Sequence, residues 1–185
     1  MTFMTHVAHP YAQRLGIIRP WKSRWFTTDK RAFREYLQVD TQLRDWLKKR
    51  LKGMYVADIE LERHDNVLRI VIKTARPGLI IGRGGDGVTK LLKETKARIA
   101  KMRLTDTPEV KFDIEEVRNP ESNAQVVAEM VAEGLEKRMT FRRVLKQIVE
   151  KVMANRDVQG VRIAIAGRVG GAEMARSEEI KRGRI

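Results

Sequence analysis

A run of glycines from Ile80 to Val88, IIGRGGDGV, carries the clearest chemical potential in this chain. The segment from Gly82 to Gly87 fits the G-x-G-x-x-G spacing of a turn that binds the pyrophosphate of a dinucleotide. The same residues contain a hydrophobic-G-x-x-G loop of the kind that approaches a nucleic-acid backbone. The first interpretation predicts an enzyme and the second a binding protein, so the elements around the loop must decide between them.

Few other residues have the types and spacing of a reactive site. The chain has no cysteine, which excludes disulfides and thiolate metal sites. Its three histidines, His6, His9 and His64, have no carboxylates spaced as in a metal cage. No carboxylate pair and no Ser-His-Asp set is visible. We therefore expect no catalytic residue, no metal, no cofactor and no small-molecule substrate.

Charge points to a polyanionic partner. Lys and Arg number 38 against 24 Asp and Glu, which gives a net charge of +14. Residues 1–53 hold 12 basic and 4 acidic side chains and residues 74–103 hold 8 and 2, whereas residues 104–134 hold 2 and 8. Such sorting concentrates positive potential on particular surfaces, so nucleic acid is the first candidate partner. The apolar runs are too short for a membrane span or a secretory signal, so we expect an intracellular chain with no membrane partner.

The elements before the loop read as a helix and a hairpin. In DTQLRDWLKKRLKG, Asp40 or Thr41 is the expected N-cap and Gly53 the C-terminal stop of an amphipathic helix. The segments VADIELER and VLRIVIK alternate apolar and polar residues on either side of the turn HDN, which predicts an antiparallel hairpin.

The loop itself stands between two helices. Pro77 can open a short helical turn before the glycines. A longer helix follows, and a third strand comes after it. The helix is marked by Val88, Leu91, Leu92, Thr95, Ile99 and Met102, and the strand by Val110, Phe112 and Ile114.

This order decides against a cofactor. A dinucleotide turn follows directly on a strand of a parallel β-α-β unit, with an acidic residue ending the next strand. Here a hairpin and a Pro-Gly turn precede the loop, and Asp106 comes before the next strand. A phosphate-binding P-loop is excluded because no Gly-Lys-Ser/Thr follows.

The order helix, strand, strand, helix, helix, strand over residues 40–118, with G-x-x-G between the later helices, resembles the type-two KH fold. The glycines then let the backbone reach a sugar-phosphate chain, and the flanking cations add charge. We expect the RNA-binding residues of this loop to be Gly82, Arg83, Gly84, Gly85 and Lys90.

Residues 1–39 are expected to form an extended basic arm with a short helix. The first 28 residues have no Asp or Glu, a composition shared by organellar presequences and by arms that lie on RNA. One interpretation is a loop pinned by Trp21, Trp25 and Phe26. The other has cations on phosphates, with the rings packing or stacking on bases. The cations are Arg14, Arg19, Lys22 and Arg24.

Residues 119–185 predict a second, small α/β domain with two helices and a strand marked by Val161, Ile163 and Ile165. On the helix from Phe141, the apolar side chains share one arc. Arg142, Arg143 and Lys146 lie together on the opposite quadrant. By itself, this pattern is also that of a solvated helix face.

Five separated blocks resemble the family of the universal third protein of the small ribosomal subunit, in its bacterial or organellar form. They are HPYAQRLGIIRPWKSRWF, TARPGLIIGRGGDGV, EEVRNPESNAQVVAE, EKRMTFRRVLKQ and IAGRVGGAEMARSE. The resemblance runs from Met4 to Ile185, so we expect no presequence and a cytoplasmic rather than an organellar ribosome. It implies an α+β ribosomal protein of the subunit head, bound to ribosomal RNA and neighbouring proteins at the entrance of the messenger RNA channel. Arg142, Arg143 and Lys146 match the family's basic helix, which faces messenger and assists its unwinding.

The sequence differs from the usual family pattern at two places, and each difference leads to an expectation about the protein. Its G-x-x-G usually holds two basic residues, whereas Arg83-Gly84 stands here, so we expect weaker phosphate contact. The chain stops at KRGRI where family members continue with further strands. We therefore expect an incomplete second domain, in which the strand from Val161 to Ala166 has few partners.

Two kinds of rival remain. One is a free KH factor of transcription or RNA maturation. The other is an enzyme, either a nicotinamide dehydrogenase or a DNA-repair lyase, which the absence of a catalytic constellation disfavours.

Overall fold

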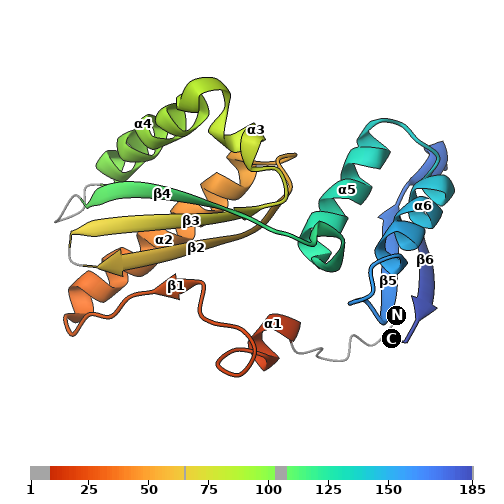
Figure 1. The fold of residues 1–185 in the computed structure, drawn as a ribbon, viewed down its shortest axis with the longest axis horizontal. Helices are drawn as coiled ribbons and strands as arrows, with labels where there is room; N and C mark the ends of the chain where they lie inside the picture. The colour runs from red at the N-terminus through yellow and green to blue at the C-terminus, as the bar shows by residue number, and fades with distance from the viewer. Residues whose placement is uncertain (1–8, 65, 103–107, 185) are drawn as a thin grey trace.

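The computed structural model describes residues 9–64, 66–102 and 108–184. His6, Asp106 and Asp65 of the HDN turn lie outside them. Figure 1 shows a first sheet with its helices, an arm beside that sheet, and a second unit of two helices and two strands. The α+β class and the type-two KH order are confirmed. In chain order the elements are α1 (Pro10–Gln13), β1 (Ser23–Arg24), α2 (Lys30–Arg50), β2 (Val56–His64), β3 (Val67–Thr74), α3 (Pro77–Ile81), η1 (Arg83–Gly85), α4 (Asp86–Lys101), β4 (Glu109–Glu116), η2 (Pro120–Ser122), α5 (Ala124–Glu136), α6 (Phe141–Met153), β5 (Gly160–Gly167), η3 (Val169–Gly171) and β6 (Arg176–Gly183).

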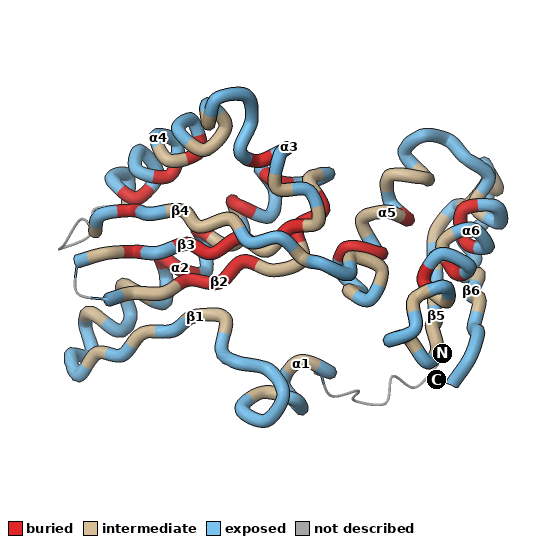
Figure 2. Tube along the Cα trace, viewed as in Figure 1, coloured by how far each residue is buried: buried red, intermediate tan, exposed pale blue. Residues whose placement is uncertain are grey.

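The first sheet has the strand order β1-β2-β3-β4. β2 and β3 form the expected antiparallel hairpin, and β4 is the expected third strand, parallel to β3. Alternate residues of these strands pack against α2 and α4 on one face, where Leu61, Leu68, Ile70 and Ile72 are fully buried. Figure 2 shows this buried layer along β2 and β3. The opposite face is left for charged side chains and for the arm.

The arm is folded back on the sheet instead of running free. Pro10 opens the single turn of α1, and β1 pairs in parallel with β2, with Ser23 opposite Leu61. The Tyr11 hydroxyl donates to the carbonyl of Pro20 at 2.7 Å, which closes the intervening loop. The predicted arm therefore lies against the first sheet, with β1 as its extended segment paired to β2.

Helix α2 begins ten residues before the predicted N-cap. Asp29 is the cap, and its carboxylate accepts a hydrogen bond from the backbone N–H of Arg31 at 3.0 Å. Asp40 lies within the helix, 1% exposed, and accepts hydrogen bonds from Arg63 Nη2 at 2.6 Å and Trp25 Nε1 at 2.7 Å. The N-cap prediction at Asp40 or Thr41 is wrong because these long-range partners override the local preference of Asp for helix ends.

The second unit contains the two predicted helices and the predicted strand, β5. It also contains β6, which sequence periodicity missed because RSEEIKRG has a single apolar residue, Ile180. β6 pairs with β5 from Gly160 opposite Gly183 to Gly167 opposite Arg176. The expectation that the strand from Val161 to Ala166 has few partners is therefore wrong for one edge of β5, which pairs with β6 along its whole length. Within the described residues its other edge is unpaired.

This topology predicts different hydrogen exchange in the two sheets. β3 lies between β2 and β4, so successive amides from Leu68 to Ile72 all face a neighbouring strand. In β5 only alternate amides face β6. We expect slow exchange throughout residues 68–72, and slow exchange only at alternate positions of residues 161–166. NMR-detected exchange on the purified chain measures both, and uniform protection of β5 would contradict the two-stranded arrangement.

Candidate nucleic-acid interface

The glycine loop between α3 and α4 presents bare backbone to the outside. Gly82, Gly84 and Gly85 have φ of 73°, 62° and 85°, in the region that favours glycine. A Cβ built on Gly84 or Gly85 would meet nothing within 4 Å, so this backbone faces open space. A polymer can therefore approach the backbone of these two glycines directly.

Gly87 has a different role, which the sequence did not reveal. A Cβ there would lie 2.2 Å from the carbonyl oxygen of Ile80 and 2.8 Å from that of Ile81. Only glycine lets the first turn of α4 pack this closely on α3. The fourth glycine of IIGRGGDGV was the available signal, and it fixes the angle at which the loop is held.

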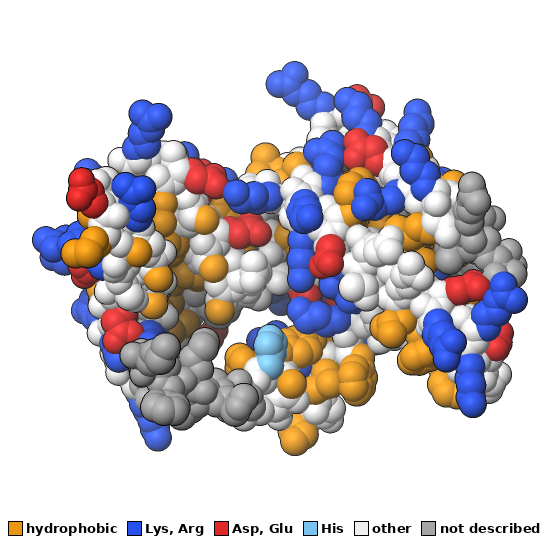
Figure 3. Space-filling model, turned by 180° about the vertical axis from the view of Figure 1, so that it is seen from behind, with side chains coloured by type: hydrophobic (Ala, Val, Ile, Leu, Met, Phe, Trp, Pro, Cys, Tyr) orange, Lys and Arg blue, Asp and Glu red, His pale blue; other side chains and the backbone are white. Residues whose placement is uncertain are grey.

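The cations around the loop have no neutralising partner among the described residues. Arg83 and Lys90 are exposed, and neither makes an ion pair with them. The same holds for Lys93, Lys96 and Lys101 farther along α4. Figure 3, which views the molecule from behind, shows Lys and Arg gathered at the upper right, and α4 of the upper left in Figure 1 falls on that side in this view.

Of the two acids on α4, Asp86 and Glu94, the second is already engaged by another helix. Arg50 Nε of α2 lies 3.0 Å from Glu94 Oε2. The hydrogen bond from Arg50 lowers the pKa of Glu94 from its ordinary value. Glu94 therefore pairs with Arg50 of α2 and not with a lysine of α4. Beside the loop, Leu79 and Ile81 are 53% and 39% exposed, so apolar surface borders the cations.

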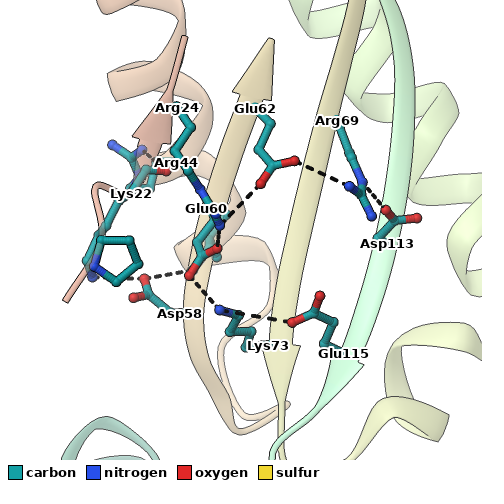
Figure 4. A network of polar contacts seen from close by, with 12 residues as sticks. Lys22, Arg24, Arg44, Asp58, Glu60, Glu62, Arg69, Lys73, Asp113 and Glu115 are labelled. Carbon is teal, nitrogen blue, oxygen red and sulfur yellow. Dashed lines mark hydrogen bonds and ion pairs between the residues drawn. The ribbon is translucent and has the colours of Figure 1, made fainter. Parts of the chain in front are cut away.

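Two of the four predicted arm cations bind the protein's own sheet. Lys22 Nζ lies 2.8 Å from Asp58 Oδ1. Arg24 pairs with Glu60 and lies 3.1 Å from Glu62 Oε1. Figure 4 shows these side chains converging on the outer face of β2. The sequence could not reveal these pairs, because they depend on the register of β1 against β2.

The network continues across the sheet. Glu60 is buried and also accepts from Lys73 Nζ at 2.6 Å, while Arg69 pairs with Asp113 (Figure 4). Cations and carboxylates therefore neutralise each other over β2, β3 and β4. This face offers little net field to a polyanion.

The other two arm cations remain open. Arg14 Nη1 donates to the carbonyl of Pro10 at 2.9 Å, and the Arg19 guanidinium lies 5.7 Å from the centroid of the Tyr11 ring. Neither has a carboxylate partner in the part of the chain that the structure describes. Of the four predicted arm cations, Lys22 and Arg24 thus bind the sheet, whereas Arg14 and Arg19 remain accessible to a partner.

The cationic quadrant of α6 lies where the sequence predicted. Arg142, Arg143 and Lys146 are exposed, whereas Val144 and Leu145 are each only 2% exposed. None of the three cations pairs with a carboxylate among residues 9–64, 66–102 and 108–184. In Figure 1 the turn before α6 and the glycine loop both lie toward the upper edge of the view.

Helix α5 joins the two units. Lys52 Nζ lies 2.9 Å from Glu136 Oε1, and nearer the start of α5 Glu129 accepts a hydrogen bond from the backbone of Val56. Burial raises the pKa of Glu129, against smaller opposing effects of Val56 and Lys52. These contacts tie α5 to the end of the first sheet.

No helix among the described residues is long and apolar enough to span a bilayer. No group of three or more His, Cys, Asp or Glu residues among them is placed to hold a metal ion.

The sequence matches two known families along most of its length. Residues 42–122 match the KH domain family, and residues 131–185 match the family described as ribosomal protein S3, C-terminal domain. The chain is 42% identical to the small ribosomal subunit protein uS3 of Endomicrobium trichonymphae, over 98% of this chain and 74% of that protein. It is 41% identical to the protein of the same name from Caldicellulosiruptor bescii, over 98% of this chain and 78% of that protein. The protein of the same name from Koribacter versatilis is 43% identical, over 98% of this chain and 77% of that protein.

Proposed function

The chain belongs to the uS3 family of small-subunit ribosomal proteins, a structural and non-enzymatic family, and we propose that it works in the subunit head at the entrance of the messenger channel. There it binds ribosomal RNA and neighbouring head proteins, and its α6 contacts incoming messenger. One observation carries the proposal. Arg83 of the glycine loop and the lysines of α4 are exposed and have no carboxylate partner among the described residues, and the same holds for Arg142, Arg143 and Lys146 of α6. The cations of the sheet face are instead neutralised by carboxylates.

The glycine loop binds RNA through its backbone and its charges. Gly84 and Gly85 leave the loop open to a sugar-phosphate chain, and Arg83 and Lys90 supply cations on either side. Because exposed lysines and arginines on phosphate release counterions, the affinity depends on salt more than on sequence.

Helix α6 acts on messenger by electrostatic attraction without chemical catalysis. Arg142, Arg143 and Lys146 bind phosphates of a single strand, which favours the open over the paired form of a messenger hairpin. Valines and leucine on the opposite face of the helix hold it against the second sheet, so the cations keep a fixed orientation.

Within the arm, the proposal assigns RNA contact to Arg14 and Arg19. Lys22 and Arg24 instead fasten the arm to β2 through Asp58, Glu60 and Glu62. A phosphate would have to displace these carboxylates to reach them.

A double substitution, Arg83→Asp with Gly84→Asp, tests the loop. We expect the fold to stay intact, because both positions are exposed and Asp tolerates the φ of Gly84. Single-stranded RNA should bind more weakly at matched salt. The slope of log affinity against log salt should also fall in magnitude by about 0.7 for each phosphate that the variant no longer neutralises.

The matched control is Arg156→Asp with Gln159→Asp, which makes the same net charge change at exposed positions between α6 and β5. Equal weakening by both doubles would show that overall charge, and not the loop, governs binding. Sedimentation of the native protein separates the proposal from a free KH factor, which would remain apart from ribosomal subunits.

A further inference from the structure

A hollow of about 540 Å³ lies at the start of α6, beside the cationic quadrant. Its walls are Thr140, Phe141 and Arg142 from the helix start, the glycine turn 169–172, and Arg176 from β6. The turn belongs to the GRVGG segment, for which the proposed function gives no role.

Two arginines line this hollow, and the guanidinium groups of both lie near one aromatic ring. Those of Arg142 and Arg176 lie 5.6 and 5.3 Å from the centroid of the same ring, Phe141. The only carboxylate paired with either in the described structure is Glu178, 3.6 Å from Arg176 Nε and on the same strand. Two like charges directed at one ring create a positive potential that an anion would relieve.

The start of α6 adds to that potential. The hydroxyl of its N-cap, Thr140, makes no capping hydrogen bond to the helix. By contrast, the Asn123 side chain caps α5 by accepting from the N–H groups of Gln125 and Val126. An uncapped helix start of this length favours a negative group near its N–H donors.

Two of the four residues of the turn, Gly170 and Gly171, bring no side chain into the hollow. Gly170 and Gly171 have φ of 70° and 79°, and a Cβ on Gly171 would meet nothing within 4 Å. Arg168 Nε donates to the carbonyl of Ala172 at 3.1 Å, which closes the turn. An incoming group can therefore reach both arginines.

We infer that this hollow binds one phosphate of single-stranded RNA, held between Arg142 and Arg176. The inference rests on the proposed function, because Arg142 is one of the α6 cations assigned to messenger. It adds Arg176, a residue of β6 more than 30 positions away in the chain, to that contact surface. An RNA strand fits better than a free anion because Arg143 and Lys146 extend the positive surface beyond the hollow.

The test uses the full chain and a fluorescein-labelled uridine decamer, with affinity measured by fluorescence anisotropy at several salt concentrations. Arg176→Ala should weaken binding about fivefold and reduce the salt slope by about 0.7, as expected when one phosphate is no longer neutralised. The matched control is Arg182→Ala, the same charge change at an exposed position about 20 Å along β6, which should change affinity less than about twofold.

Equal effects of Arg176→Ala and Arg182→Ala would overturn the inference. The proposed function would still stand if the Arg142, Arg143 and Lys146 triple alanine variant bound the decamer more weakly in the same assay. A triple variant with parental affinity would overturn both. Inorganic phosphate at matched ionic strength should displace the decamer no better than chloride does, and stronger displacement would mean a site for a free anion instead.

Discussion

Replacing Asp40 by Ala is expected to lower the free energy of unfolding by about 3–5 kcal/mol, the largest stability effect that we predict for one side chain. Asp40 is 1% exposed and accepts hydrogen bonds from Arg63 and Trp25. The Arg63 side chain is itself only 7% exposed. Without the carboxylate, a buried guanidinium would be left uncompensated, and such a group costs more than the ion pair contributes.

Urea unfolding followed by circular dichroism measures this change. Asp45→Ala is the control, because Asp45 is exposed on the same helix, and it should change the unfolding free energy by less than about 0.5 kcal/mol. Similar values for the two variants would mean that the Asp40 and Arg63 pair does not hold α2 and the arm to the sheet.

The triple variant of α6, with Arg142, Arg143 and Lys146 changed to Ala, is expected to assemble into subunits and to translate stable messenger hairpins about tenfold more slowly. Each exposed contact with phosphate contributes about 0.5 kcal/mol, so three together correspond to about one factor of ten. Assembly is unaffected because the changes remove charge from the exposed face and open no cavity among Val144, Leu145 and their neighbours.

Translation assays with hairpin and hairpin-free messengers of equal length measure the effect. A control triple, Arg156, Arg182 and Arg184 to Ala, removes the same charge at exposed positions elsewhere in the second unit. Equal slowing on hairpin-free messenger, or by the control triple, would argue against a role of α6 in unwinding.

Sequence periodicity predicted the elements whose burial follows a regular repeat. The stripe of Leu91, Thr95 and Ile99 indicated α4, and alternation indicated β2, β3 and β4, because burial on one face leaves that pattern in a single sequence. The sequence did not predict β6 because this strand has too few buried apolar residues to show an alternating pattern. Asp40 misled because its partner, Arg63, is 23 residues away, beyond any local rule.

The same distinction separates the parts of the interface. Which face of α6 is exposed follows from the periodicity of its apolar residues. Spacing alone could therefore place Arg142, Arg143 and Lys146 on that face. The pairing of Lys22 and Arg24 with carboxylates of β2 depends on the register of β1 against β2. That register cannot be predicted from the arm residues alone. The role of Gly87 depends on the close packing of α4 on α3, which the sequence does not reveal. The place of Arg176 beside the start of α6 likewise depends on a contact between β6 and α6.

The most direct test of the account is a density map of this organism's small ribosomal subunit programmed with messenger, at a resolution that shows side chains. We predict RNA phosphates within hydrogen-bonding distance of the loop from Gly82 to Gly85 and of the α6 cations, while Lys22 and Arg24 remain on Asp58 and Glu60. A map with RNA on the neutralised outer face of the sheet, and with the glycine loop and α6 away from RNA, would contradict it.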